Sequence, residues 1–433
     1  MHRRAVAFAA LAWCAVPFQA AAQNPSTPRT LTLPDAEQLA LQRHPTIKVG
    51  EAAALAAHEM VHEARSAYLP TAVGAVTAAD ASAESTRIAA GGLNNPTVFD
   101  RLATGVAVSQ LVTDFGRTHD LVQSTTLSAE SRDRETDARR ADVLLVVDRS
   151  YFDALRAQAV LRVAEETVTT RQTVADQIQA LADSNLKSSL DVSFARVNLG
   201  EAQLLRVQAQ NDLASAQAAL SAAVGDPVSS SYLLVDEGDL SPPPDDSAAL
   251  VAEALRSRPD VAARRLAADA ATKFAEAERA LWMPSLAAVG VAGVTPYHAN
   301  GITDHYAAAG VNLTVPLSNG GLFNARHAEA AFRAEALQES ARELENGIAR
   351  DVTIAWLATR TAFQRLDLTR ALLAQASDAL ELAQSRYNLG LTSIVELTQA
   401  QLNKTSAEIA QSSARYDYRA RLAALRYTTG TLK

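Results

Sequence analysis

Residues 58–62 are the part of the chain whose residue types and spacing could most readily do chemistry. They read His58-Glu59-Met60-Val61-His62 and fit the H-E-x-x-H pattern of zinc peptidases. In that pattern the two histidines lie one helical turn apart and bind the metal, while the glutamate acts as the base. The next acids, Glu63, Asp80 and Glu84, are poorly spaced to supply a fixed third ligand. We therefore interpret the segment as a solvated helix face.

A second short motif is Asp114-Phe115-Gly116, which resembles a protein-kinase tripeptide. No Gly-rich loop and no His-Arg-Asp segment accompany it. Glycine tolerates a positive φ, so the motif is better interpreted as a turn between a strand and a helix. No Ser-His-Asp set or phosphate-binding loop is visible either. The sequence predicts no catalytic, cofactor-binding or metal-binding residues, and therefore not an enzyme.

The first 22 residues have the order of a cleavable secretory signal. Basic residues at positions 3 and 4 precede an apolar stretch, residues 5–18, which is followed by Ala20-Ala21-Ala22. Cys14 is the only cysteine, and bulky Trp13 before it argues against a lipoprotein anchor. The chain is thus expected to leave the cytoplasm, with cleavage near Ala22 and no disulfide in the mature protein.

Charge and hydropathy exclude several classes of protein. Removing Arg3 and Arg4 leaves 38 basic and 48 acidic side chains, a net charge of −10, which makes nucleic acid a poor partner. No run of about 18 apolar residues follows the signal, so any membrane span must be a strand. Apolar residues make up 48% of the chain but aromatic residues only 5%, which favours thin, closely packed helices.

The chain contains two copies of one unit. Residues recur at an offset of 214 and, further along, of 205: Pro45 with Pro259, Pro70 with Pro284, Gly116 with Gly321, Tyr151 with Trp356, and Asp191 with Glu396. The smaller offset predicts a connection nine residues longer in the first copy, within residues 79–97. We divide the chain into a first repeat (23–234), a proline-rich linker (235–247) and a second repeat (248–433).

Each repeat is predicted to open with one helix, at residues 33–66 or 248–281, and then a pair of strands, at about 70–113 or 284–317. Apolar residues alternate through the second pair at Ala307, Ala309, Val311, Leu313, Val315 and Leu317. Strands of 10 to 13 residues with one apolar face are typical of a membrane β-barrel. Four strands cannot close a barrel, so the sequence predicts an oligomer. The alternative is a small soluble sheet.

Helical periodicity then runs for about a hundred residues in each repeat, with one interruption near residues 184–190 and another near 388–393. Apolar positions step by fours and threes at Phe363, Leu366, Leu373, Ala376, Leu380, Ala383 and Tyr387, with Arg370 among them. Two long antiparallel coiled-coil hairpins are implied. A helix of about 65 residues is roughly 100 Å long, so the expected object is a tube or a rod.

The second interruption, Tyr387-Asn388-Leu389-Gly390-Leu391-Thr392, is similar to the hairpin tip of the TolC-like outer membrane efflux family. This resemblance covers nearly the whole chain after the signal. It implies a mainly α protein with β strands, in which a homotrimer forms a 12-stranded membrane β-barrel continuous with a periplasmic α-helical barrel. It further implies an adaptor protein and an inner-membrane pump as partners, and the outer membrane of a Gram-negative bacterium as the location.

The resemblance also implies two sites. The hairpin tips, which would dock on the adaptor, match Leu389, Gly390, Leu391 and Thr392, with Asn185 and Leu186 as their first-repeat counterparts. Acidic residues after the second tip ring the tunnel constriction in this family. Glu396 takes the first of those positions, and uncharged Gln399 takes the next. The alternative is that Glu396 is an ordinary exposed residue of the coiled coil.

The expected function is therefore an outer-membrane exit duct for small molecules or polypeptides. The alternative is a soluble periplasmic coiled-coil scaffold.

Overall fold

The computed structural model describes residues 29–79, 101–226, 232–236, 240–298 and 303–432. The predicted signal segment, Cys14 and most of the predicted long connection lie outside these residues. The first half of the chain contains β1 (Arg29–Leu31), α1 (Leu33–Arg43), α2 (Pro45–Ser66), β2 (Thr71–Ala79), β3 (Arg101–Thr113), α3 (Arg117–Asp183), α4 (Ser189–Ala223) and β4 (Tyr232–Leu234). The second half contains α5 (Ser247–Ser257), α6 (Pro259–Arg279), a short 3₁₀ turn (Ala280–Trp282), β5 (Ser285–His298), β6 (His305–Thr314), α7 (Leu322–Asn388) and α8 (Ile394–Thr428).

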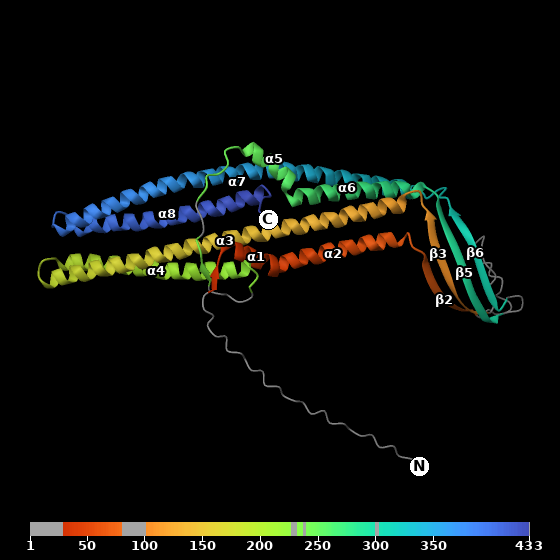
Figure 1. Ribbon diagram of the computed structural model, residues 1–433, viewed down its shortest axis with the longest axis horizontal. Helices are drawn as coiled ribbons and strands as arrows, with labels where there is room; N and C mark the ends of the chain where they lie inside the picture. Colours follow the sequence, from red (N-terminus) through yellow and green to blue (C-terminus); the bar gives the residue numbers. More distant parts are fainter. Residues whose placement is uncertain (1–28, 80–100, 227–231, 237–239, 299–302, 433) are drawn as a thin grey trace, which may run out of the picture.

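The molecule is elongated, with a sheet at one end and two helical hairpins at the other (Figure 1). Near the sheet the helices contact one another in the order α2, α3, α6, α7. Beyond the middle the order becomes α4, α3, α8, α7. The helices therefore form a single layer whose two edges are α2 with α4, and α7.

The longest helices, α3 and α7, have 67 residues each, which confirms the expected length of about 65. Each begins after a glycine in the left-handed region, at Gly116 (φ 104°) and Gly321 (φ 87°), as expected of a strand-to-helix turn. Small residues line the contacts between neighbouring helices. The buried residues of α4 include Ala195, Ala202 and Ala209, one every seven positions. Such spacing keeps one narrow face of the helix against its neighbour.

The prediction of one helix before each strand pair was wrong. The structure has two, α1 with α2 and α5 with α6, separated at His44 and Arg258. Each of these residues precedes a proline and has an extended backbone, with ψ of 125° and 126°. The proline ring disfavours the helical conformation of the preceding residue, so Pro45 and Pro259 each start a new helix instead of continuing one.

The four long strands form an antiparallel sheet in the order β2-β3-β5-β6. Val106, Ala292 and Ala307 lie in one row across the sheet, and Gly105, Gly293 and Tyr306 lie in the next. Val106 and Ala307 thus share one face of the sheet, as the predicted alternation requires, whereas Val289 and Val291 lie on the other face, paired with Gly310 and Ala308. The strand expected to reach Leu317 ends at Thr314, because Pro316 has no N–H to donate to a neighbouring strand.

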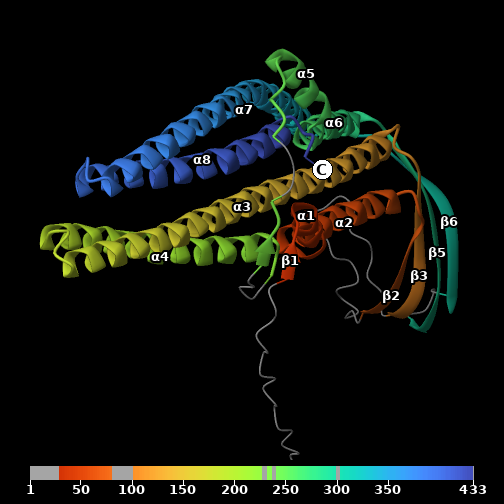
Figure 2. The same cartoon turned by 60° about the vertical axis from the view of Figure 1, so that its left-hand side comes forward.

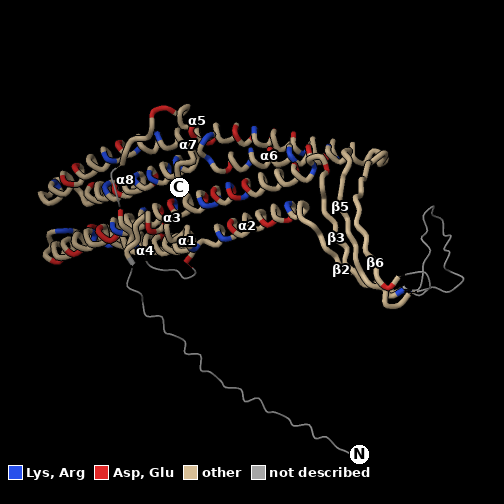
Figure 3. The backbone as a smooth tube through the Cα atoms, turned by 45° about the vertical axis from the view of Figure 1, so that its right-hand side comes forward, with Lys and Arg blue, Asp and Glu red and all other residues tan. Residues whose placement is uncertain are grey.

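Charges are distributed along the helices and are nearly absent from the strands (Figure 3). Arg101 is the only Lys, Arg, Asp or Glu within β2, β3, β5 and β6. Every residue of β6 is exposed, Val311 and Leu313 among them. Among the described residues, no helix combines the length and the apolar character needed to cross a membrane.

The short elements α1, α5, β1 and β4 lie around the middle of the long helices (Figure 2). The Tyr151 hydroxyl is buried and donates to the carbonyls of Leu31 (2.9 Å) and Val235 (2.8 Å), which joins the parallel β1–β4 pair to α3. Its repeat partner Trp356 donates to the carbonyl of Pro244 (2.7 Å). Two repeat-equivalent aromatic side chains thus hold the two ends of the segment that connects the halves.

A buried carboxyl group lies in this middle region. Asp148 on α3 is only 3% exposed, and its Oδ1 has no hydrogen-bond partner. Burial first, and then the neighbouring carboxylate of Glu37, raise the pKa of Asp148 from 3.8 to about 8, although Arg426 acts in the opposite direction. Asp148 is therefore mostly protonated in the folded protein at neutral pH.

The Asp148→Asn variant should be more stable than the parent at pH 8, by on the order of 5 kcal/mol. The folded pKa exceeds the unfolded one, so the stability from the protonated carboxyl is fully present below about pH 4 and is lost as the pH rises to about 8. Each pH unit in that window removes up to about 1.4 kcal/mol. Thermal unfolding at pH 5, 6.5 and 8 measures how the free energy of unfolding changes with pH. This change should be smaller in the Asp148→Asn variant than in the parent.

The matched control for this experiment is Asp153→Asn on the same helix. Asp153 is 56% exposed and pairs with Arg156 at 3.1 Å, so its removal should leave the pH slope unchanged. If Asp148→Asn kept the parent's pH dependence, the carboxyl would not be protonated in the folded protein.

Candidate functional site

The two hairpin tips, for which the family resemblance predicts a docking role, have the same backbone conformation. Asn185 (φ 56°) and Gly390 (φ 73°) lie 205 positions apart, and both adopt the left-handed conformation just after a long helix. In each tip the next residue donates its N–H back into the helix: Leu186 to Leu181 (2.8 Å) and Leu391 to Arg386 (2.9 Å). These bonds end the helix in a Schellman-type turn. Asparagine therefore does in the first tip what glycine does in the second.

Large apolar side chains at both tips point into solvent. Leu186 is 70% exposed, Leu389 73% and Leu391 65%. Such exposure at the end of a rod leaves apolar surface that a binding partner could cover. Thr392 is half-buried, and its hydroxyl donates to the Glu396 carboxylate.

The two residues expected at the constriction lie on one exposed face of α8, three positions apart. Glu396 is 46% exposed and accepts from Arg386 at 2.9 Å as well as from Thr392. Gln399 donates to Asn403 at 2.9 Å. Arg386 of the same hairpin thus partly neutralises the charge of Glu396. The sequence did not predict this ion pair.

The structure brings the two hairpin tips together. Ile178, Ala195, Tyr387 and Leu397 share one buried cluster between the hairpins. The Lys187 ammonium lies 4.1 Å from the centre of the Tyr387 ring, a cation–π contact from one tip to the other.

Two polar contacts continue this seam along the hairpins. Asn198 donates to Thr398 at 2.9 Å, and buried Arg171 donates to Gln401. Sequence reasoning missed Lys187 and Arg171. The only available signal was Tyr387, the last apolar residue of the heptad pattern.

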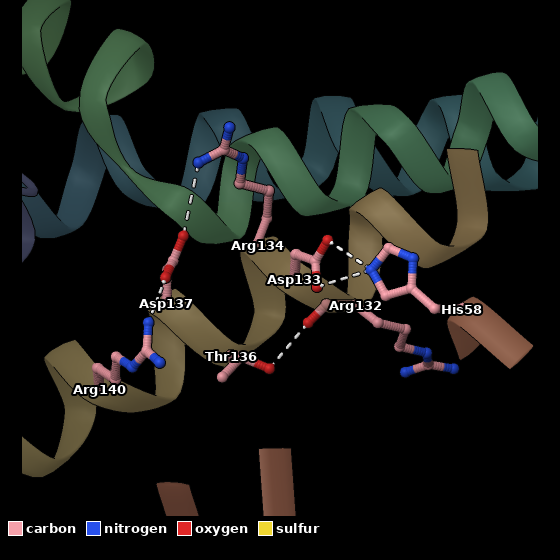
Figure 4. Close-up of polar contacts among 7 residues, drawn as sticks. All are labelled: His58, Arg132, Asp133, Arg134, Thr136, Asp137 and Arg140. Carbon is pink, nitrogen blue, oxygen red and sulfur yellow. Dashed lines mark hydrogen bonds and ion pairs between the residues drawn. The ribbon is translucent and has the colours of Figure 1, made fainter. Parts of the chain in front are cut away.

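The peptidase-like segment lies on α2, far along the chain from these tips. His58 and His62 are exposed, and His58 Nε2 is 3.1 Å from the Asp133 carboxylate of α3 (Figure 4). In the part of the chain that the structure describes, no three His, Cys, Asp or Glu side chains are grouped to hold a metal ion.

Within the kinase-like tripeptide, Asp114 accepts from the backbone N–H of Thr118 at 2.8 Å and so caps the start of α3.

The fold is that of outer-membrane channels of known structure. CmeC of Campylobacter jejuni superimposes with a TM-score of 0.77 at 17% identity, covering 92% of this chain and 85% of that one. VceC of Vibrio cholerae superimposes with a TM-score of 0.77 at 18% identity, covering 92% and 96%. A four-stranded sheet that continues into long paired helices is thus a known channel architecture.

The sequence identifies the family. The family model of outer membrane efflux proteins matches residues 36–226 and 250–431, and the chain belongs to that family. It is 26% identical to the outer membrane protein TolC of Vibrio cholerae over 318 residues, 70% of this chain and 72% of TolC. It is also 26% identical to the toluene efflux pump outer membrane protein TtgC of Pseudomonas putida over 305 residues, which span 68% of this chain and 61% of TtgC. The protein is accordingly an outer-membrane protein of the Gram-negative type with a large periplasmic helical part.

Proposed function

We propose that the protein is the exit duct of a tripartite efflux or secretion system, formed by three copies of the chain. The observation that carries this proposal is the open layer: both the sheet and the helical array have two unpaired edges. The edge strands β2 and β6 leave backbone N–H and C=O groups without partners in the sheet. Such edges are not tolerated in lipid, where every backbone polar group needs a partner.

Joining the edge of one copy to the opposite edge of the next supplies those partners. The two edges differ, so the contact is head-to-tail, and a head-to-tail contact closes into a ring when the rotation allows it. Three copies would give a barrel of twelve strands continuous with a tube of helices. The strands have 9 to 14 residues, enough for a tilted strand to cross a bilayer.

Exposed apolar stripes on the helical edges support the same assembly. On α4 the stripe consists of Leu190, Phe194, Val197 and Leu204, spaced by four, three and seven residues and 40% to 72% exposed. On α7, at the other edge, the stripe consists of Ile354, Leu357, Leu368, Leu372 and Leu382, 50% to 69% exposed. A second copy of the chain is the occupant that covers both stripes at once.

The proposed roles of the tips, the partner proteins and the cargo depend on this assembly. The apolar tips would dock on a periplasmic adaptor, and an inner-membrane pump would supply the energy. The duct itself would do no chemistry and would pass small molecules or polypeptides. The toluene efflux named for TtgC supports a small organic cargo. In this proposal the two repeats, 23–234 and 248–433, are equivalent halves of the wall joined by the linker.

Glu396→Ala should weaken block of the channel by multivalent cations, by about tenfold in the blocking concentration. Three copies would place three carboxylates around one axis, a site that attracts such cations. Arg386 already neutralises part of this charge, so Arg386→Gln should strengthen the block. Single-channel conductance with a trivalent cation measures both changes. An unchanged block in Glu396→Ala would remove Glu396 from the constriction.

The alternative function, a soluble periplasmic scaffold, is separated from the duct by fractionation. A duct subunit stays with the outer membrane after osmotic shock and needs detergent for release, whereas a scaffold appears in the shock fluid. A peptidase, the third class, would lose activity in Glu59→Gln.

A further inference from the structure

A cavity of about 620 Å³ lies between α3 and the start of α6, at the level of the short helices α1 and α5. Its volume is that of a site for a drug-sized ligand. Both repeats contribute to it: α1 and α3 from the first, and the α5–α6 junction and the chain end after α8 from the second. Among the described residues that line it, none belongs to the edge helices α2, α4 and α7.

The lining of this cavity divides into an apolar part and a cationic part. Leu41, Leu144, Pro259 and Leu432 contribute apolar surface, and Leu144 is almost completely buried. Four guanidinium groups share the lining with a single carboxylate: Arg134, Arg140, Arg256, Arg258 and Asp137. A ligand that filled this cavity would therefore meet apolar carbon at one part and guanidinium N–H donors at another.

The arginines differ in how fully their donors are used. Arg258 is 12% exposed and donates to both carboxylate oxygens of Asp260 and to the carbonyl of Thr428, so it is part of the framework. Arg134 donates to Asp137 at 3.5 Å, and Arg256 to Glu253 at 3.0 Å. A guanidinium has five N–H donors, so each of these two has donors beyond that one bond.

Figure 4 shows Asp137 between Arg134 and Arg140, with a contact to each. Arg134 and Arg140 are 56% and 43% exposed, so their guanidinium groups are accessible to a ligand that enters from solvent. Asp137 thus contacts two arginines at this side of the cavity, and Arg140 also pairs with Glu51 of α2 at 3.1 Å.

These charges restrict the ligand. Four guanidinium groups disfavour a cation, and Arg134 and Arg256 offer a ligand N–H donors beyond the bonds that they already make. Asp137 in the lining, with Glu51 and Glu253 as further partners of the arginines, disfavours a polyanion. A single negative charge attached to an apolar chain satisfies both parts of the lining, because a guanidinium fork matches a carboxylate or phosphate oxygen pair. We propose that this cavity binds a single-chain amphiphile with one anionic head group, of the fatty-acid class.

The test is photoaffinity labelling of the full chain in a neutral detergent, with a dodecanoate analogue that carries a diazirine on its alkyl chain. Peptide mapping should place the label on segments around Leu41, Leu144 and Leu432. Excess dodecanoate should prevent labelling, whereas dodecanol, which lacks the charge, and acetate, which lacks the chain, should not. Label confined to the strands, or protection by dodecanol equal to that by dodecanoate, would overturn the proposal.

A pair of variants tests the head-group contact. Arg134→Gln with Arg256→Gln should reduce labelling of these peptides about tenfold, the size expected for lost charge-assisted hydrogen bonds. The control is Arg342→Gln on α7, because Arg342 matches Arg256 in exposure (72% against 73%) and in having an acidic partner three residues before it. Equal labelling in the double variant and the control would mean that the probe associates with the protein non-specifically, at high concentration only. That result would contradict the proposed binding site.

Discussion

Val197→Glu combined with Leu204→Glu should abolish assembly of the ring and reduce export to background. Both side chains lie on the exposed stripe of α4, at 58% and 72% exposure, so the monomer should still fold. In the assembled ring each glutamate would bury an unpaired charge, at a cost on the order of 3 kcal/mol per site. Each of the three interfaces would contain two such charges. The measurement is native gel migration of the detergent-extracted protein, alongside export of a fluorescent substrate.

The control for this double variant is Gln203→Glu, which adds the same charge beside the stripe at an exposed polar position. It should assemble and export normally. A stable trimer with normal export in the Val197→Glu, Leu204→Glu protein would show that the stripe is not a subunit contact.

Leu391→Asp should abolish export while leaving the assembly intact. Leu391 is 65% exposed at the second tip and contributes little to folding, so a charge there should act on the partner that covers the tip. The loss should appear in an export assay and in chemical cross-linking to the adaptor, with unchanged trimers on native gels.

Gly390 separates the backbone requirement of this tip from its docking role. Gly390→Asn should be tolerated, because Asn185 holds the same left-handed conformation in the first tip. Gly390→Asp fits that conformation almost as well but adds a charge, so it should lose export as Leu391→Asp does. Normal export in either aspartate variant would remove the tip from the docking surface.

Most of the fold was accessible from the sequence because local patterns and the repeat agree. Heptad spacing in the second half correctly marked Leu366, Ala376 and Tyr387 as buried, and the alternation through Ala307 and Val311 correctly marked a strand. The prediction of a single helix failed because the residues on both sides of Pro45 favour a helix. In the structure the effect of Pro45 on the preceding residue prevails and separates two helices. Pro316 has a similar effect: the last strand ends at Thr314, before the predicted end at Leu317.

The tip residues could be located by pattern, but their contacts could not. The pair of Arg386 with Glu396 spans ten residues across a turn, and Lys187 with Tyr387 spans two hairpins. Neither follows from helical spacing, because each depends on how two separate helices pack. The partly buried cavity beside Arg134 and Arg256 is similar: its walls come from both repeats and converge only in the folded chain.

Electron microscopy of the protein purified from outer membranes in detergent tests directly whether three copies form one continuous duct. We expect particles with a three-fold end view and a stem of about 100 Å, the length of a 67-residue helix. Monomers recovered from the periplasm without detergent would contradict it.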